Sequence, residues 1–139
     1  NWIYACRKRS GVDLLPASKA GISLLRILRQ NGMVAMVIDA GVNSKIGISV
    51  KFMGRDVLFP VGPARLARMS GAPIVFGLAI RKRELKYHAY ISAPIFSDRS
   101  LEAEDDIKLM TQKVVDELEH FVKLYPNQWY VFRDLFLDA

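Results

Sequence analysis

Asp39 is the acidic residue best placed to take part in chemistry. It directly follows the apolar run Met33–Ile38 and precedes a small, polar, glycine-bounded loop at residues 40–47. Ligands of open α/β sheets bind beyond the carboxyl ends of the strands, so a carboxylate at this point occupies a favoured position for a site. The alternative is that Asp39 caps the loop by accepting hydrogen bonds from nearby backbone N–H groups.

Two groups of basic residues could bind an anion. Arg65 and Arg68 follow the helix-initiating pair Gly62-Pro63, where unpaired backbone N–H groups can hold a phosphate. Arg7–Arg9 is the second group, and arginine suits bidentate contact with phosphate or carboxylate. Solvated arginines on ordinary helices are the alternative for both groups.

Familiar catalytic motifs are absent from the sequence. It contains no G-x-S-x-G elbow, no Walker glycine loop and no G-x-G-x-x-G after a strand, which disfavours covalent serine chemistry and nucleotide binding. Neither His88 nor His120 is followed, after four intervening residues, by an acid. The one cysteine, Cys6, belongs to no cluster with zinc-ligand spacing, so we expect neither a metal nor a cofactor.

The charge balance indicates an anionic partner. Lys and Arg number 20 against 14 Asp and Glu, a formal net charge of +6, and the excess lies mostly upstream of residue 84. The partner could be phospholipid, a phosphorylated small molecule, an acidic carrier protein or nucleic acid, although basic residues also simply solvate surfaces. The longest apolar runs, Met33–Ile38 and Gly71–Ile80, are shorter than the roughly 18 residues that span a bilayer.

Five strand-like segments would position these residues. Met33–Ile38 has the continuous apolar composition of a strand buried on both faces. Apolar residues then alternate with polar ones from Ile48 to Phe52, as in a half-buried strand that Gly54 turns back. Pro73–Ile80 and Leu85–Ile91 resemble a pair of strands joined by a charged turn. A shorter β segment is expected at 12–15.

The expected helices alternate with these strands. Trp2–Ser10 reads as a helix closed by Gly11, Ser18 is a good N-cap for a second helix ended by Asn31-Gly32, and Gly62 is the expected N-cap of a third, which runs to Gly71. A long fourth helix has apolar residues at helical spacing, at positions Ile107, Met110, Val114, Leu118 and Phe121. The order predicts a single α/β domain over residues 1–139, with a mainly parallel sheet flanked by helices and an added antiparallel hairpin.

Taken together, the segments resemble a known family of enzymes. They occur in the family's order, at Arg7–Gly11, the apolar run ending in Asp39, Gly47–Arg55, Pro60–Ala67, Gly71–Val75, and Tyr125–Trp129 with Arg133. On these segments the chain is similar to the bacterial lipid A biosynthesis (lauroyl/myristoyl) acyltransferases, which are related to phosphatidylinositol mannoside acyltransferase. The resemblance implies a glycerolipid-acyltransferase-like fold and identifies the chain as the C-terminal part of such an enzyme.

The resemblance also implies an activity and its partners. Family members transfer a fatty acyl chain from an acyl carrier protein or coenzyme A thioester to a hydroxyl of a glycolipid such as a lipid A precursor. They act at the cytoplasmic face of the bacterial inner membrane, with an anionic membrane surface and no nucleic acid as partner. The family's general base is a histidine followed, after four residues, by Asp or Glu. Its place is expected upstream of Asn1, so we expect these 139 residues alone to be inactive.

The same resemblance assigns substrate-binding residues. Arg7 would bind the acceptor or its phosphate, and Asp39 with the loop after it would form part of the family's third motif. The wall of the substrate pocket would be shaped by Gly47, Phe52, Gly54 and Arg55. Gly62 would bind substrate at the anion-binding helix start described above. Two rivals remain open: a degenerate relative without activity, and a non-catalytic basic domain that binds an anionic membrane or nucleic acid through Arg7–Arg9 and Arg81–Arg83. The sequence contains no recognisable nucleic-acid-binding motif.

Overall fold

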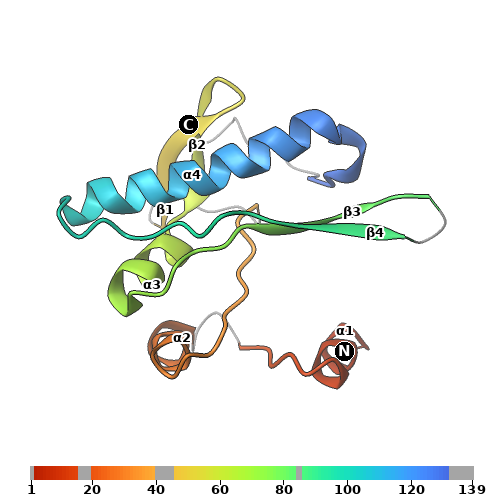
Figure 1. Ribbon diagram of the computed structural model, residues 1–139, viewed down its shortest axis with the longest axis horizontal. Helices are drawn as coiled ribbons and strands as arrows, with labels where there is room; N and C mark the ends of the chain where they lie inside the picture. The colour runs from red at the N-terminus through yellow and green to blue at the C-terminus, as the bar shows by residue number, and fades with distance from the viewer. Residues whose placement is uncertain (1, 16–19, 40–45, 84–85, 132–139) are drawn as a thin grey trace. The chain divides into compact units, whose positions relative to one another are not determined.

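A computed structural model describes residues 2–15, 20–39, 46–83 and 86–131, which contain helices and two β-hairpins (Figure 1). The mixed α/β class expected from the sequence is confirmed. The strands form two separate antiparallel pairs, and no parallel pair occurs in the described ranges. The expected parallel sheet is therefore not observed there. The chain divides into two compact units, residues 1–34 and 35–139, which are described separately.

The first unit contains the helices α1 (Trp2–Arg9) and α2 (Ala20–Arg29). α1 ends where the sequence predicted, since Gly11 has a φ of +78° and its N–H donates to Lys8 O at 3.1 Å. α2 also ends as predicted, because Gly32 N–H donates to Ile27 O at 2.9 Å and closes the last turn. The predicted N-cap, Ser18, lies outside the described residues.

Two predicted strands do not form. Residues 12–15 and Met33–Ile38 have no strand partner in the described part of the chain. Met33 is 94% exposed, and Val37 is also exposed, whereas a strand buried on both faces was expected. An apolar run expresses a preference for burial and extension, but a strand exists only where a neighbouring backbone accepts and donates its hydrogen bonds. Asp39 thus follows an irregular segment.

The second unit begins with a hairpin of β1 (Gly47–Phe52) and β2 (Arg55–Pro60). The pairing runs from Gly47 opposite Pro60 to Phe52 opposite Arg55, which leaves a two-residue turn. Both turn residues have positive φ, +51° at Met53 and +76° at Gly54, as a type I′ turn requires. The predicted alternation and turn are confirmed, and the inward residues are Val50, Phe52, Val57 and Phe59.

Helix α3 (Gly62–Ser70) follows β2 directly. Its N-cap is Val61, one residue before the predicted Gly62, because Val61 has a right-handed backbone and its carbonyl already accepts the N–H of Arg65 at 2.9 Å. Gly62 is instead the first helical residue. The predicted end is confirmed, since Gly71 has a φ of +81° and donates its N–H to Ala67 O at 2.8 Å.

The second hairpin consists of β3 (Gly77–Arg81) and β4 (Tyr87–Ile91), with an additional bridge between Ile74 and Ile95. The predicted antiparallel pair is confirmed with shorter strands, and β3 ends one residue later than predicted. In Figure 1 this hairpin extends alongside helix α4 and beyond its C-terminal part.

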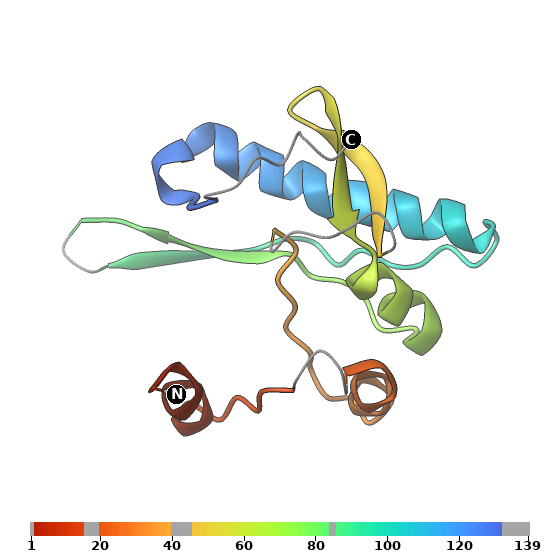
Figure 2. The same cartoon turned by 180° about the vertical axis from the view of Figure 1, so that it is seen from behind.

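Helix α4 (Ala103–Leu124) supplies one side of the core. It packs against β1 and α3, as Figure 2 shows from behind. The apolar stripe predicted from the sequence is confirmed, because its buried residues include Met110, Val114, Val115, Leu118 and Val122. The helix ends at Tyr125, and the short 3-10 helix η2 (Pro126–Gln128) follows.

Two glutamine side chains fasten strands to the C-terminal helices. Gln112 of α4 accepts the N–H of Lys51 at 2.8 Å and donates to its carbonyl at 2.8 Å. Gln128 of η2 accepts the N–H of Arg81 at 2.8 Å and donates to its carbonyl at 3.1 Å. Each amide therefore holds both backbone groups of one strand residue.

Candidate functional site

Asp39 is held by a tryptophan from the far end of the chain. The indole N–H of Trp129 donates to Asp39 Oδ2 at 3.1 Å, across 90 residues of sequence. The Trp129 ring in turn lies 5.5 Å from the ring of Phe52, centroid to centroid, at an interplanar angle of 65°. The structure thus links two predicted site residues, Asp39 and Phe52, through Trp129, for which the sequence predicted no role in the site.

The support for this contact is an aromatic cluster inside the core. Phe52 is completely buried and lies in edge-to-face contact with Phe59, at 5.6 Å between ring centroids, as well as with Trp129. Such contacts add stability beyond the apolar area that they bury. The indole of Trp129 packs against the core, and this packing directs its N–H toward the carboxylate oxygen of Asp39.

The β1–β2 turn contributes Gly54 and Arg55 at the same end of the hairpin as Phe52. A Cβ built on Gly54 would meet nothing within 4 Å, so glycine is required here by the turn and not by a close contact. The turn is fastened to α4, since Glu119 Oε2 accepts the N–H of Met53 at 2.6 Å. Hydrogen bonds from Lys123 and from this N–H lower the pKa of Glu119, which favours its charged form.

Gly47 and Gly62 lie at the opposite end of the hairpin. Gly47 is paired with Pro60, two residues before Gly62. A Cβ on Gly62 would stand 2.9 Å from Cε of Met36, so a glycine lets the segment that leads to Asp39 approach the start of α3.

A small apolar recess adjoins the segment before Asp39. Its wall includes Ile38, Phe59, Pro63 and Ala64, together with apolar side chains of α4, and it encloses about 230 Å³ including the space at its mouth. Its surface is almost entirely apolar. Among the residues that the structure describes, no charged side chain lines the recess, so they offer nothing to hold an anion.

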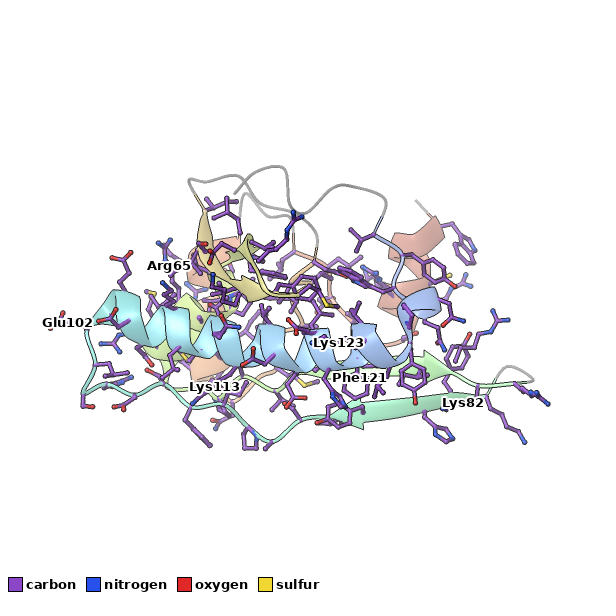
Figure 3. All side chains as sticks on the ribbon, turned by 90° about the horizontal axis from the view of Figure 1, so that it is seen from above. Arg65, Lys82, Glu102, Lys113, Phe121 and Lys123 are labelled. Carbon is purple, nitrogen blue, oxygen red and sulfur yellow. The ribbon has the colours of Figure 1, made fainter. Side chains whose placement is uncertain are left out.

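The arginine pair of α3 divides into two roles. Arg65 is exposed (Figure 3), whereas Arg68 is 21% exposed at its side chain and its Nη1 lies 2.7 Å from Oδ2 of the completely buried Asp106. Ser97 Oγ donates to the same oxygen at 2.6 Å, and the N–H of Asp98 donates to Oδ1 at 2.9 Å. Arg68 is therefore engaged within the protein, which removes it from the anion site suggested by the spacing.

Asp106 stays charged because its donors outweigh its burial. Burial raises the pKa of this carboxyl, but the hydrogen bonds from Ser97, Arg68 and the Asp98 N–H together bring the pKa below its ordinary value. The burial of Asp106 was not predicted from the sequence. A signal for its burial exists, since Asp106 precedes Met110 by four residues and Val114 by eight and so lies on the apolar stripe.

The other candidates lie on other elements of the fold or in the other unit. Arg7 belongs to the last turn of α1 in the first unit, where Arg7–Arg9 are all exposed. His88 is exposed on β4, and His120 is exposed on α4 with its ring 5.2 Å from that of Phe121. The loop at 40–45 and Arg133 lie outside the described residues.

Neither a metal site nor a membrane span is found in the described ranges. They contain no group of three or more His, Cys, Asp or Glu side chains arranged to hold a metal ion. None of the helices there is both long enough and apolar enough to cross a bilayer.

Comparison with protein families identifies a match over nearly the whole chain. A protein-family model described as "Bacterial lipid A biosynthesis acyltransferase" matches residues 1–138. A search of curated proteins gives no match. The family match covers both units, and it includes Arg7, Asp39 and Trp129.

Proposed function

Because the chain belongs to the bacterial lipid A biosynthesis acyltransferase family, we propose that it serves the transfer of a fatty acyl chain from an acyl thioester to a hydroxyl of a glycolipid. The donor is an acyl carrier protein or coenzyme A thioester, and the acceptor is a glycolipid such as a lipid A precursor. The protein works at the cytoplasmic face of the inner membrane. The family match supports acyl transfer, while donor, acceptor and location are our proposals.

The reaction needs a base, an oriented hydroxyl and a leaving thiol. The acceptor oxygen attacks the thioester carbonyl carbon, the base takes the hydroxyl proton, and the thiolate leaves and is protonated. We assign the base to the histidine–acid pair that the family resemblance implies. His88 and His120 receive no role, because both are exposed and neither is followed at that spacing by an acid.

Asp39 and Arg7 are the acceptor-binding residues in this proposal. The Asp39 carboxylate accepts hydrogen bonds from sugar hydroxyls of the glycolipid, and Arg7 pairs with an acceptor phosphate. The observation that carries the proposal is the hydrogen bond from Trp129 to Asp39 at 3.1 Å, anchored on the completely buried Phe52. A carboxylate fixed by packed aromatic groups keeps its direction without reorganisation when the substrate binds.

The proposal is tested by acyl transfer with the protein as it is encoded. The purified protein is incubated in mixed micelles with an acyl thioester and a phosphorylated glycolipid, and the acylated product is measured by mass spectrometry. Asp39→Asn keeps the size of the side chain and removes its charge. Losing a charged hydrogen bond lowers kcat/KM by roughly tenfold to a hundredfold. The matched control is Asp56→Asn, which changes an exposed aspartate on β2 paired with the exposed Lys51.

Trp129→Phe separates positioning from packing. This variant keeps an aromatic ring against Phe52 but loses the N–H that orients Asp39, so we expect kcat/KM to fall roughly twofold to tenfold. Transfer by Asp39→Asn at the wild-type rate would remove Asp39 from the site. Absence of transfer by the wild type, combined with salt-sensitive oligonucleotide binding, would favour a non-catalytic basic domain.

A further inference from the structure

The β3–β4 hairpin has two unlike faces, which its register defines. Residues opposite each other in an antiparallel pair lie on the same face. One face carries Tyr90, whose ring lies 4.5 Å from that of Phe121 and whose hydroxyl bonds to Glu117 at 3.1 Å, so this face packs toward α4. We call the other one the outward face, and its residues are Gly77, Ala79, Arg81, Tyr87, Ala89 and Ile91.

The outward face is exposed and largely apolar. All six of its residues are exposed, and the two largest apolar side chains, Ile91 and Tyr87, are 70% and 58% exposed. Its one charged side chain is Arg81, which stands opposite Tyr87 at the end of the ladder. An exposed apolar strip that ends in an aromatic residue and a cation matches the layering of a membrane interface.

Cationic residues gather where the hairpin turns. Arg81, Lys82, Arg83 and Lys86 are all exposed, and we call them the basic tip. Lys82 lies near the turn end of the hairpin (Figure 3), and its Nζ lies 4.9 Å from the centre of the Tyr125 ring, just before η2. The described residues of the hairpin, 77–83 and 86–91, include no acidic side chain. The turn between Arg83 and Lys86 also contains Glu84, which lies outside the described residues, so the segment 81–86 carries four basic residues and one acidic residue and is net positive.

We propose that the β3–β4 hairpin docks the protein on an anionic phospholipid surface. The basic tip binds the lipid phosphates, while Tyr87 and Ile91 of the outward face enter the boundary between headgroups and acyl chains. Unpaired backbone groups are costly at a lipid boundary, and at the edge of β3 near the tip Gln128 already bonds both backbone groups of Arg81. An acidic protein would be matched by the cations alone and would leave the adjoining apolar strip unexplained.

Vesicle binding tests this proposal without any acyl transfer, so its outcome is independent of the proposed enzymatic function. The protein is centrifuged with vesicles of phosphatidylcholine, with and without phosphatidylglycerol, at low and high salt. The double variant Arg83→Glu/Lys86→Glu removes two cations of the basic tip. Each cation near an anionic surface contributes about fivefold to partition, so the loss of two cations lowers binding by about 25-fold or more.

The control variant makes the same charge change elsewhere. Lys108→Glu/Lys113→Glu replaces two exposed lysines of α4 and should leave binding within about threefold of the wild type, because charges that lie beyond a Debye length of about 10 Å from the lipid are screened. Ile91→Ser tests the apolar contribution, and we expect it to weaken the binding that persists at high salt by roughly fivefold. Circular dichroism checks that each variant is folded.

Four results would overturn the proposal. They are equal binding of the wild type to both vesicle types, equal loss in the two double variants, and unchanged binding of Ile91→Ser at high salt. The fourth is unchanged vesicle binding of Arg83→Glu/Lys86→Glu together with lost binding to an acidic acyl carrier protein, which would make the basic tip a protein-docking site.

Discussion

Replacing Asp106 with asparagine tests whether its buried carboxylate holds α3, α4 and the segment between β4 and α4 together. Asp106 Oδ2 receives two donors, Arg68 Nη1 at 2.7 Å and Ser97 Oγ at 2.6 Å. Asparagine can keep a carbonyl oxygen toward the N–H of Asp98. It must then place its amide nitrogen, which is a donor, against the guanidinium of Arg68.

The magnitude follows from what remains of the cluster. Removing one partner of a buried ion pair costs about 3–5 kcal/mol. Arg68 keeps part of its compensation, because its side chain is 21% exposed and donates to Asp98 O at 3.2 Å and Leu101 O at 3.0 Å. We therefore expect the lower end of the range, a loss of about 3 kcal/mol, which corresponds to a fall in Tm of roughly 10 °C for a chain of this size.

The assay is urea unfolding of the full chain followed by tryptophan fluorescence, with a thermal melt in parallel. Asp105→Asn is the matched control, because it is the same substitution one residue earlier, at an exposed position in the first turn of α4. It should cost less than about 1 kcal/mol. If Asp106→Asn stays within about 1 kcal/mol of the wild type, or if both variants lose the same amount, the cluster does not stabilise the fold.

Further predictions concern the pH dependence, the first hairpin and the core. The pKa of Asp106 is lowered in the folded state, so its contribution to stability is present above the unfolded pKa of about 3.9 and is lost as the pH falls through the folded value. Below about pH 4, Tm should therefore fall more steeply in the wild type than in Asp106→Asn. Parallel pH profiles of the two proteins would contradict this. Gly54→Ala should lower the free energy of unfolding in urea by about 1 kcal/mol, because Gly54 has a φ of +76°. Gly21→Ala in α2 is the control and should be neutral or stabilising, because a Cβ there would meet nothing within 4 Å. Equal effects of the two substitutions would refute the turn argument. Phe52→Ala should lower the free energy of unfolding by about 3–5 kcal/mol, and a loss below about 1 kcal/mol would show that the aromatic cluster is not packed as described.

Local sequence patterns predicted the elements whose formation depends on neighbours in sequence. The alternation from Ile48 to Phe52 and the glycine at 54 give the first hairpin, and the apolar stripe of α4 gives the long helix. The strand prediction for Met33–Ile38 was wrong because a strand there needs a partner from elsewhere in the chain. Apolar composition does not identify that partner, so the parallel sheet could not be derived from this run.

The candidate site was predictable only in part. Asp39 and Phe52 were chosen from their place in the sequence and from the family resemblance, but neither gives a distance. The bond from Trp129 spans 90 residues, and only packing of the aromatic cluster brings its two ends together. Burial of an indole does predict that its N–H will find an acceptor, although it does not say which one. The acceptor-binding role of Arg7 stays a prediction.

The paired contacts of Gln112 and Gln128 bear on how the protein avoids self-association. An edge strand exposes unpaired N–H and C=O groups that invite a strand from another molecule and so begin aggregation. Each amide bonds one such pair, at Lys51 on β1 and at Arg81 on β3, as a neighbouring strand would. A foreign strand must first displace these glutamines. Helical side chains thus protect two short sheets from growing into an intermolecular one.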